Sequence, residues 1–372
     1  MKIGFLLPTL FASKKLFPDR IFAPGDLARD TVNGLVARGH EVYVFSTPDF
    51  ETDGKLVAGD VKPFADKLMY SKLGRVSADE AAIRNDEVWK RSFEIAVSTL
   101  AYEAAEKEHL DIIHAYHDFL FTPHYLENLT HVPTVYTLHD PLPPKGTFEY
   151  HTYEHFAKHR YVSISNSQRK SDLPLTFAGT VYHGLNVAHF PFEGTDHGYV
   201  LFMGRLAPQK GLHTAIQAAI QSGLPLEIGT NFPDFFKGDA YFEKQIKPYL
   251  DNPLIHEPGM VSGKNKMLLY KDARALLFPI EWEEPFGMVM IEAMACGTPV
   301  IAYNRGSVPE IVKDGVTGFV VDENKGVAGL VEAIKKIDQI DRAVCRKHVE
   351  EKFTIEKMVD GYEQVYKKIL SQ

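Results

Sequence analysis

The feature that most constrains the fold is an alternation of short apolar runs with helical segments, which occurs twice along the 372 residues. Such runs predict buried parallel strands, because strands covered on both faces lack a polar alternation. The first series comprises residues 2–7, 41–46, 111–116, 133–138, 160–165 and 180–184, and the second comprises 198–204, 224–229, 273–280, 298–303 and 318–322. Two such series predict two doubly wound α/β domains.

The length suits two domains, and 45% hydrophobic residues supply a core for each. The predicted domains are residues 1–187 and 188–352, followed by a C-terminal helix over 353–372 with Ile355, Met358, Tyr362 and Val365 on one face. An early helix is predicted with Asp26 as N-cap and Gly39 just past its C-terminus. Residues 64–108 also read mainly as helix.

Composition excludes several classes of protein. A net charge of -8 and a pI near 6.1 argue against a broad nucleic-acid-binding face. Cys296 and Cys345 show no ligand spacing, which suits a reducing cytoplasm. The apolar start of the chain reads as a first strand rather than a signal peptide, and no apolar run approaches the roughly 20 residues that span a bilayer.

The stretch EPFGMVMIEAMACGTPV, residues 284–300, contains two carboxylates, Glu284 and Glu292, whose role needs an explanation. Pro285 and Gly287 predict a helix that begins at 286–288, and its free N–H groups suit an anion or sugar oxygens. Two carboxylates that accept hydrogen bonds from hydroxyls form a polyol site. The alternatives are a helix-dipole acid with a core ion pair, or an acid–base pair for glycoside hydrolysis.

A second segment, MGRLAPQKG, follows a predicted strand directly. Gly204 permits a tight turn, Arg205 and Lys210 supply two cations, and Gly211 precedes a helix. An arginine fork and a lysine charge can bind a diphosphate, although a solvated basic loop is an equal alternative. The segment matches neither the dinucleotide nor the P-loop glycine pattern.

Histidines follow two predicted strands, with His139 beside Asp140 in one case and His114 and His117 in the other. A single histidine at such a place is more often structural. The sequence contains no HExxH, and no Asp-x-Asp that would hold a metal-bridged diphosphate. We therefore expect no metal, with Arg205 and Lys210 supplying the electrostatic work.

These segments together resemble the GT-B glycosyltransferases of family 4, the retaining group that uses nucleotide sugars. The resemblance covers essentially the whole chain and is strongest over residues 284–322, where Glu284 and Glu292 match the Glu-x7-Glu motif. GRLAPQKG matches the phosphate-binding turn, and TVYTLHDP, SISNSQR and VYHGLNV match further family segments. The resemblance implies a GT-B fold of two Rossmann-like domains. The first would bind the acceptor and the second the donor, and the C-terminal helix would return to the first.

The resemblance also implies roles for individual residues. Glu292 would accept from the ribose hydroxyls and Glu284 would contact the transferred sugar. Arg205 and Lys210 would neutralise the leaving diphosphate, and His139 would lie near O6 of the sugar. The backbone groups of Phe286, Gly287, Met288 and Val289 would contact sugar and phosphate, beside Gly204. The sugar would be transferred with retention, by same-face attack with the leaving phosphate as base.

One region departs from the family pattern. Members often carry a Gly-Gly turn after the first strand, whereas this chain has the single Gly25 and a basic loop with Lys14, Lys15 and Arg20. That loop could steer an anionic acceptor or a membrane head group, or be merely solvated.

The expected donor is a nucleotide-diphosphate sugar, with a UDP sugar such as UDP-glucose favoured and GDP and ADP sugars open. The acceptor (lipid, glycan or small molecule), the oligomeric state and a peripheral contact at the inner face of the membrane stay open. Alternative functions are a GT-B-fold epimerase, a phosphorylase, which would need a pyridoxal cofactor, or a non-catalytic nucleotide-sugar-binding protein.

Overall fold

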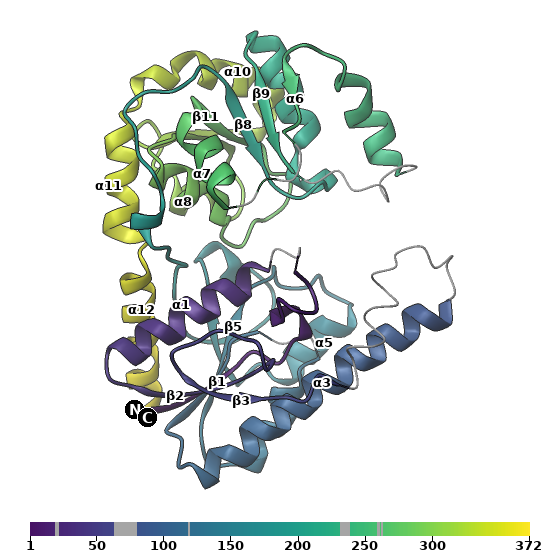
Figure 1. The fold of residues 1–372 in the computed structure, drawn as a ribbon, viewed down its shortest axis with the longest axis vertical. Coiled ribbons are helices and arrows are strands. Elements are labelled where there is room, and N and C mark those ends of the chain that lie inside the picture. Colours follow the sequence, from purple (N-terminus) through teal and green to yellow (C-terminus); the bar gives the residue numbers. More distant parts are fainter. Residues whose placement is uncertain (19–21, 63–79, 118–119, 231–238, 259–260, 262) are drawn as a thin grey trace. The chain divides into compact units, whose positions relative to one another are not determined.

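The computed structural model describes residues 1–18, 22–62, 80–117, 120–230, 239–258, 261 and 263–372 (Figure 1). The chain forms two compact units, each built around a parallel sheet. Unit 1 comprises Met1–Ile164, Ser171–Tyr182 and Ile355–Gln372, and unit 2 comprises Ser165–Lys170 and His183–Thr354. Arg20 and residues 64–79 of the predicted helix over 64–108 lie outside the described residues.

The sheet of unit 1 has seven strands in the order β3-β2-β1-β4-β5-β6-β7. All of its strand pairs are parallel. The strands are β1 Lys2–Leu6, β2 Glu41–Ser46, β3 Lys55–Ala58, β4 Ile112–Ala115, β5 Thr134–Leu138, β6 Arg160–Ser163 and β7 Thr176–Thr180. Its α-helices are α1 Ala23–Ala37, α3 Glu80–Lys107, α4 Thr122–Leu126, α5 Phe148–His155 and α12 Ile355–Leu370.

The sheet of unit 2 has six parallel strands in the order β10-β9-β8-β11-β12-β13. They are β8 Val200–Met203, β9 Leu226–Gly229, β10 Ile255–His256, β11 Ala275–Phe278, β12 Val300–Tyr303 and β13 Gly318–Val321. The helices are α6 Leu212–Ser222, α7 Gly263–Asp272, α8 Met288–Ala295, α9 Val308–Ile311, α10 Gly326–Lys336 and α11 Arg342–Lys352. Two parallel, Rossmann-like sheets confirm the predicted fold class. Within the described residues, no helix combines the length and apolar character needed to cross a bilayer.

Three local predictions need correction. The strand expected at 180–184 ends at Thr180, and Val181 instead packs beneath Gly361 of α12. β propensity largely reflects how well a side chain suits a half-buried surface, and Val181 is buried equally well by packing against a helix. Asp26 is not the N-cap of α1, because the helix already begins at Ala23 with Pro24 in its first turn. The edge strands β3 and β10 were not predicted; β3 is largely exposed with three apolar residues and β10 has two residues in all, so their apolar runs are too short to indicate strands.

The C-terminal helix α12 packs against α1 of unit 1, as Figure 1 shows for the yellow and purple helices. Gly34 of α1 makes close packing possible, since a Cβ at this position would lie 2.6 Å from Cγ2 of Val359. The helix is also hydrogen-bonded to the sheet. The hydroxyl of Tyr366 lies 2.7 Å from Nδ1 of His114 in β4, and Nε2 of His114 lies 2.7 Å from the hydroxyl of Thr137. These contacts make the last helix an integral part of unit 1.

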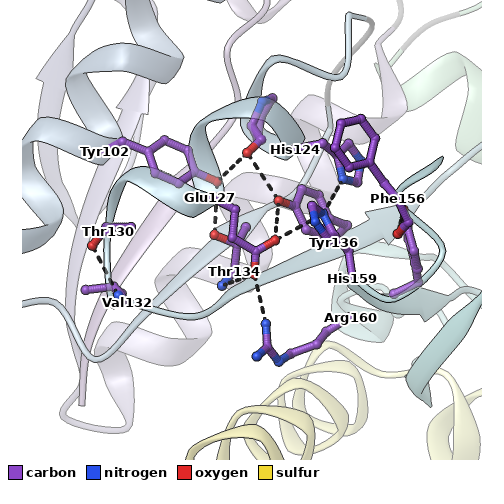
Figure 2. A network of polar contacts seen from close by, with 12 residues as sticks. Tyr102, His124, Glu127, Thr130, Val132, Thr134, Tyr136, Phe156, His159 and Arg160 are labelled. Carbon is purple, nitrogen blue, oxygen red and sulfur yellow. Dashed lines mark hydrogen bonds and ion pairs between the residues drawn. The ribbon is translucent and has the colours of Figure 1, made fainter. Parts of the chain in front are cut away.

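A buried polar network joins the amino ends of β5 and β6 to the segment after α4 (Figure 2). Glu127 accepts hydrogen bonds from Tyr136, at 2.9 Å, and from Arg160, at 2.8 Å, and lies 3.1 Å from Nδ1 of His159. His159 in turn contacts His124, whose ring stacks on Tyr136 with centroids 3.8 Å apart. Burial lowers the pKa of both histidines, and the carboxylate of Glu127 opposes this effect at His159. The network lies at the amino edge of the sheet, opposite the carboxyl ends of the strands where ligands of such sheets bind.

Candidate donor site

The topology of unit 2 gathers the predicted donor residues at one point. β8 and β11 are neighbours in the sheet, although about seventy residues separate them in the chain. β9 lies on the other side of β8 and β12 on the other side of β11, so strand order reverses between them. In open α/β sheets ligands bind outside the carboxyl ends of the strands at such a switch point. The segments that follow β8, at 204–211, and β11, at 279–287, meet there.

Glu284 and Lys210 come into direct contact in this place. Nζ of Lys210 lies 2.6 Å from Oε2 of Glu284, and the side chains are 13% and 10% exposed. The indole N–H of Trp282 donates to the same oxygen over 2.8 Å, and the ammonium lies 4.6 Å from the centre of the indole ring. The predicted phosphate-binding cation and sugar-binding carboxylate therefore form one cluster. Both donors occupy Oε2, which leaves Oε1 as the acceptor for another group.

The backbone around Glu284 is held by the loop after β12. Gly306 adopts φ +52°, and a Cβ there would lie 2.4 Å from both the nitrogen and the carbonyl oxygen of Glu284. Ser307 N–H donates to the carbonyl oxygen of Glu284 over 2.9 Å, and its hydroxyl donates to that of Phe286 over 2.8 Å. Only glycine fits at residue 306, because the approach is closer than any side chain permits.

Helix α8 begins where the sequence predicts. Gly287 is the N-cap with φ +77°, and no side chain of the described residues caps the helix, so the first N–H groups at Met288 and Val289 are available to a ligand. Phe286 is buried against His183 at a centroid distance of 4.9 Å, which anchors the start of the helix. Burial lowers the pKa of His183 to about 3, so it contributes no positive charge at neutral pH. The positive end of the helix dipole thus serves a predicted anion site.

Glu292 is held by a second pair of donors, from α7. Nζ of Lys266 lies 2.8 Å from each carboxylate oxygen, and the hydroxyl of Tyr270 donates to Oε2 over 2.7 Å. Burial and the neighbouring Glu292 raise the pKa of Tyr270, so the phenol remains a donor. The same two causes raise the pKa of Cys296 to about 12, which keeps it a thiol. The core ion pair that the sequence offered as an alternative exists in this form, and Glu292 remains 14% exposed.

The turn after β8 carries the other predicted cation. Arg205 is exposed and makes no hydrogen bond or ion pair among the described residues, whereas Gly204 is half-buried. The turn is pinned at its far end by Gly211, where φ is +74° and a Cβ would lie 2.0 Å from the carbonyl oxygen of Pro279. Glu281 N–H also donates to the carbonyl oxygen of Gln209 over 2.9 Å. These contacts fix the turn against the segment that leads to Glu284.

His139 and Gly25 belong to unit 1, at the carboxyl ends of its strands. His139 directly follows β5, and its ring stacks on His117 with centroids 5.5 Å apart. Burial lowers the pKa of His117 to about 4, against the opposing charge of Asp140. Gly25 lies in the first turn of α1, donates its N–H to the carbonyl oxygen of Phe22 over 3.0 Å, and lines a cavity of about 40 Å³.

Sequence reasoning missed the residues that hold the two acids. Trp282 lies two positions before Glu284, but a tryptophan in a loop does not by itself indicate which group its indole N–H contacts. Lys266 and Tyr270 lie in α7, which is remote in sequence from Glu292. Their spacing of four residues on one helix was a usable signal, because it places two hydrogen-bond donors on the same face. Gly306 was also missed, as the sequence does not show which backbone it approaches.

One cluster of potential metal ligands occurs among the described residues, at Glu193, His197 and Asp272. The ammonium of Lys271 lies 2.9 Å from Glu193 and 3.0 Å from Asp272. A cation of the protein itself therefore compensates these carboxylates.

Comparison with known proteins agrees with the fold. A family model described as glycosyl transferases group 1 matches residues 190–351, and one described as glycosyltransferase family 4 matches residues 26–171. A protein named as an uncharacterized glycosyltransferase of Methanocaldococcus jannaschii is 30% identical over 284 residues, 71% of this chain and 77% of that protein. A protein of the Klebsiella pneumoniae cps region, named as uncharacterized, is 34% identical over 175 residues. That segment spans 45% of this chain and about half, 46%, of the relative.

Solved structures show the same architecture. HepE of Anabaena, in complex with UDP and glucose, superimposes with a TM-score of 0.71 at 17% identity, with both chains covered completely. Two Rossmann-like units with these sheets define the GT-B class of glycosyltransferase folds. Together with the family models and the Methanocaldococcus jannaschii relative, this shows that the chain belongs to the GT-B glycosyltransferases of family 4.

Proposed function

We propose that the chain is a retaining glycosyltransferase that moves a hexose from a nucleotide-diphosphate sugar to an acceptor hydroxyl. The observation that carries the proposal is the 2.6 Å contact between Lys210 and Glu284 at the switch point of unit 2. It joins a cation suited to phosphate with a carboxylate suited to sugar hydroxyls. A UDP sugar such as UDP-glucose is the favoured donor, and the UDP and glucose in the HepE complex support this choice.

The donor would be held by groups from three segments of unit 2. Arg205 and Lys210 would neutralise the diphosphate, together with the free N–H groups at the start of α8. Glu284 would accept from a sugar hydroxyl through Oε1, since Lys210 and Trp282 both bind Oε2. Glu292 would accept from the ribose hydroxyls. These groups bind charge and hydroxyls without a metal, so we propose metal-independent catalysis.

The transfer step would be a same-face displacement at the anomeric carbon. The bond from this carbon to the phosphate oxygen breaks as the bond to the acceptor oxygen forms, and the acceptor proton passes to the departing phosphate. Negative charge accumulates on the diphosphate, where Arg205 and Lys210 stabilise it. His139 would lie near O6 of the sugar. Gly25, in the first turn of α1, would let the donor approach the backbone.

Unit 1 would bind the acceptor, which we leave chemically open as a lipid, a glycan or a small molecule. A peripheral contact with the inner face of a membrane would suit a lipid acceptor. Lys14, in the loop after β1, lines the small cavity beside Gly25 and is exposed there. Lys14 and Lys15, both exposed in this loop, would attract an anionic acceptor.

The test begins with thermal unfolding in the presence of UDP, GDP, ADP and their sugar conjugates, with and without chelator. A ligand that binds only the folded chain raises Tm by mass action. We expect a shift with one nucleotide family, unchanged by chelator, followed by slow release of sugar from the matching donor. The anomeric configuration of the released or transferred sugar, read by NMR, should be that of the donor. An inverted product would refute retention, and interconversion of the donor without release would indicate an epimerase.

A further inference from the structure

The two acids of the donor site are held in the same manner by different elements. Each carboxylate contacts one lysine ammonium and one aromatic donor, Lys210 and Trp282 for Glu284, and Lys266 and Tyr270 for Glu292. In each case the ammonium also lies near the aromatic ring, at 4.6 Å and 5.7 Å from its centre. The family motif accounts for the acids and for Lys210. It does not account for Lys266 and Tyr270, which α7 supplies.

The contacts around Glu292 define where its carboxylate can act. A carboxylate has about four acceptor positions, and the contacts from Lys266 and Tyr270 use at most three of them. Tyr270 is fully buried and fixed, whereas Lys266 is 23% exposed. A free glutamate side chain would lose rotamer freedom on binding a ligand, and these contacts remove that cost in advance.

Charge gives Lys266 a second effect. A nucleoside diphosphate is anionic, and an uncompensated carboxylate beside it would repel the phosphates. The ammonium of Lys266 lies 2.8 Å from both oxygens of Glu292 and cancels this charge locally. Glu292 can then serve as a hydrogen-bond acceptor for neutral hydroxyls without opposing the diphosphate.

We propose that Lys266, supported by Tyr270, is the positioning residue that makes Glu292 selective for a ribose cis-diol. The inference rests on the proposed function, because it assigns the ribose of the donor nucleotide to Glu292. Lys266 acts through Glu292 and not on the reacting atoms. Removing its ammonium should therefore weaken the binding of ribonucleotides far more than the binding of nucleotides that lack the two ribose hydroxyls.

The experiment measures Kd by calorimetry for UDP, GDP and ADP and for their 2′,3′-dideoxy forms. The proteins are the unaltered chain, Lys266→Met, Tyr270→Phe, and Lys264→Met as a matched control, since Lys264 is an exposed lysine of the same helix. In the unaltered chain we expect the ribonucleotide to bind at least about tenfold more tightly than its dideoxy form, as a charged hydrogen bond provides. Lys266→Met should lose most of that ratio, and the dideoxy form should weaken by a smaller factor, because the uncompensated carboxylate of Glu292 then repels the diphosphate. Tyr270→Phe should lose part of the ratio, and Lys264→Met none.

Other outcomes would overturn the role of Lys266, the assignment of the ribose to Glu292, or the proposed function. Equal weakening of the ribonucleotide and its dideoxy form in Lys266→Met would refute selectivity through Glu292 and leave Lys266 a charge-compensating role alone. Unchanged affinity for both forms in Lys266→Met would refute any role of Lys266 while leaving the donor site intact. Binding without any ribose preference in the unaltered chain would refute the assignment of Glu292 and this inference with it. Failure of all three nucleotides to bind would refute the proposed function itself.

Discussion

Nζ of Lys210 lies 2.6 Å from Oε2 of Glu284, so the residue predicted to bind phosphate and the residue predicted to bind sugar form one ion pair. Both side chains are mostly buried, which makes this pair more sensitive to the loss of a partner than a surface pair. A donor that enters the site must share the ammonium with Glu284 or draw it away. The relationship makes the two residues energetically coupled, and it shapes the first two predictions.

Lys210→Met should lower kcat with the sugar nucleotide by about 100-fold or more, because the leaving diphosphate loses a preorganised cation. Affinity for the nucleoside without phosphates should change little. Steady-state kinetics and calorimetry measure the two effects, with Lys335→Met, an exposed lysine of α10, as the control. Equal losses for nucleoside and sugar nucleotide would contradict a role at the diphosphate.

Trp282→Phe should lower kcat/KM for the sugar nucleotide by about tenfold, since Glu284 loses the 2.8 Å hydrogen bond that helps fix its carboxylate. The phenyl ring keeps an aromatic face for the cation–π contact with Lys210. Affinity for the nucleoside diphosphate should therefore stay within about threefold, as this group does not contact Glu284. A large loss of nucleoside diphosphate affinity would show that the indole itself lies against the nucleotide.

Gly306→Ala should destabilise unit 2 by about 2–4 kcal/mol, because φ is +52° and the new Cβ would lie 2.4 Å from the backbone of Glu284. Displacement of Glu284 should also weaken donor binding. Urea unfolding and nucleotide calorimetry measure both effects. Gly194→Ala is the control, because its Cβ would meet nothing within 4 Å. A variant as stable as the control would mean that the loop after β12 adapts easily.

The stability of unit 1 should fall on acidification. Burial lowers the pKa of His114 to about 3 in the folded chain, from about 6.5 in the unfolded chain. The unfolded state then binds more protons below about pH 6.5, so the free energy of unfolding falls by up to about 1.4 kcal/mol per pH unit for this one group down to about pH 3. Urea unfolding at pH 7, 6 and 5 measures the slope.

His114→Gln keeps a polar side chain near Tyr366 and Thr137 but removes the titrating group. It should lower stability at neutral pH and make the acid slope shallower by nearly one proton. An unchanged slope would show that other buried histidines, such as His117, whose pKa burial lowers to about 4, account for the acid sensitivity.

Local sequence determined a large part of this protein. The apolar runs predicted most strands of both sheets, because a buried parallel strand needs contiguous side chains that tolerate burial. Gly287 and Pro285 predicted the start of α8, and Gly39 the end of α1, since these residues have restricted or unusual backbone preferences. Edge strands such as β3 escaped prediction because they are largely exposed to solvent and their apolar runs are short.

Only the tertiary structure decided how the acids are held. The parallel pairing of β8 with β11 brings Lys210 to Glu284, and the packing of α7 near α8 brings Lys266 and Tyr270 to Glu292. These partners are separated by 22 to 74 residues, so no local propensity links them. A chain encodes helices and strands through short-range preferences, but a hydrogen bond between remote side chains exists only once the sheet order has been chosen.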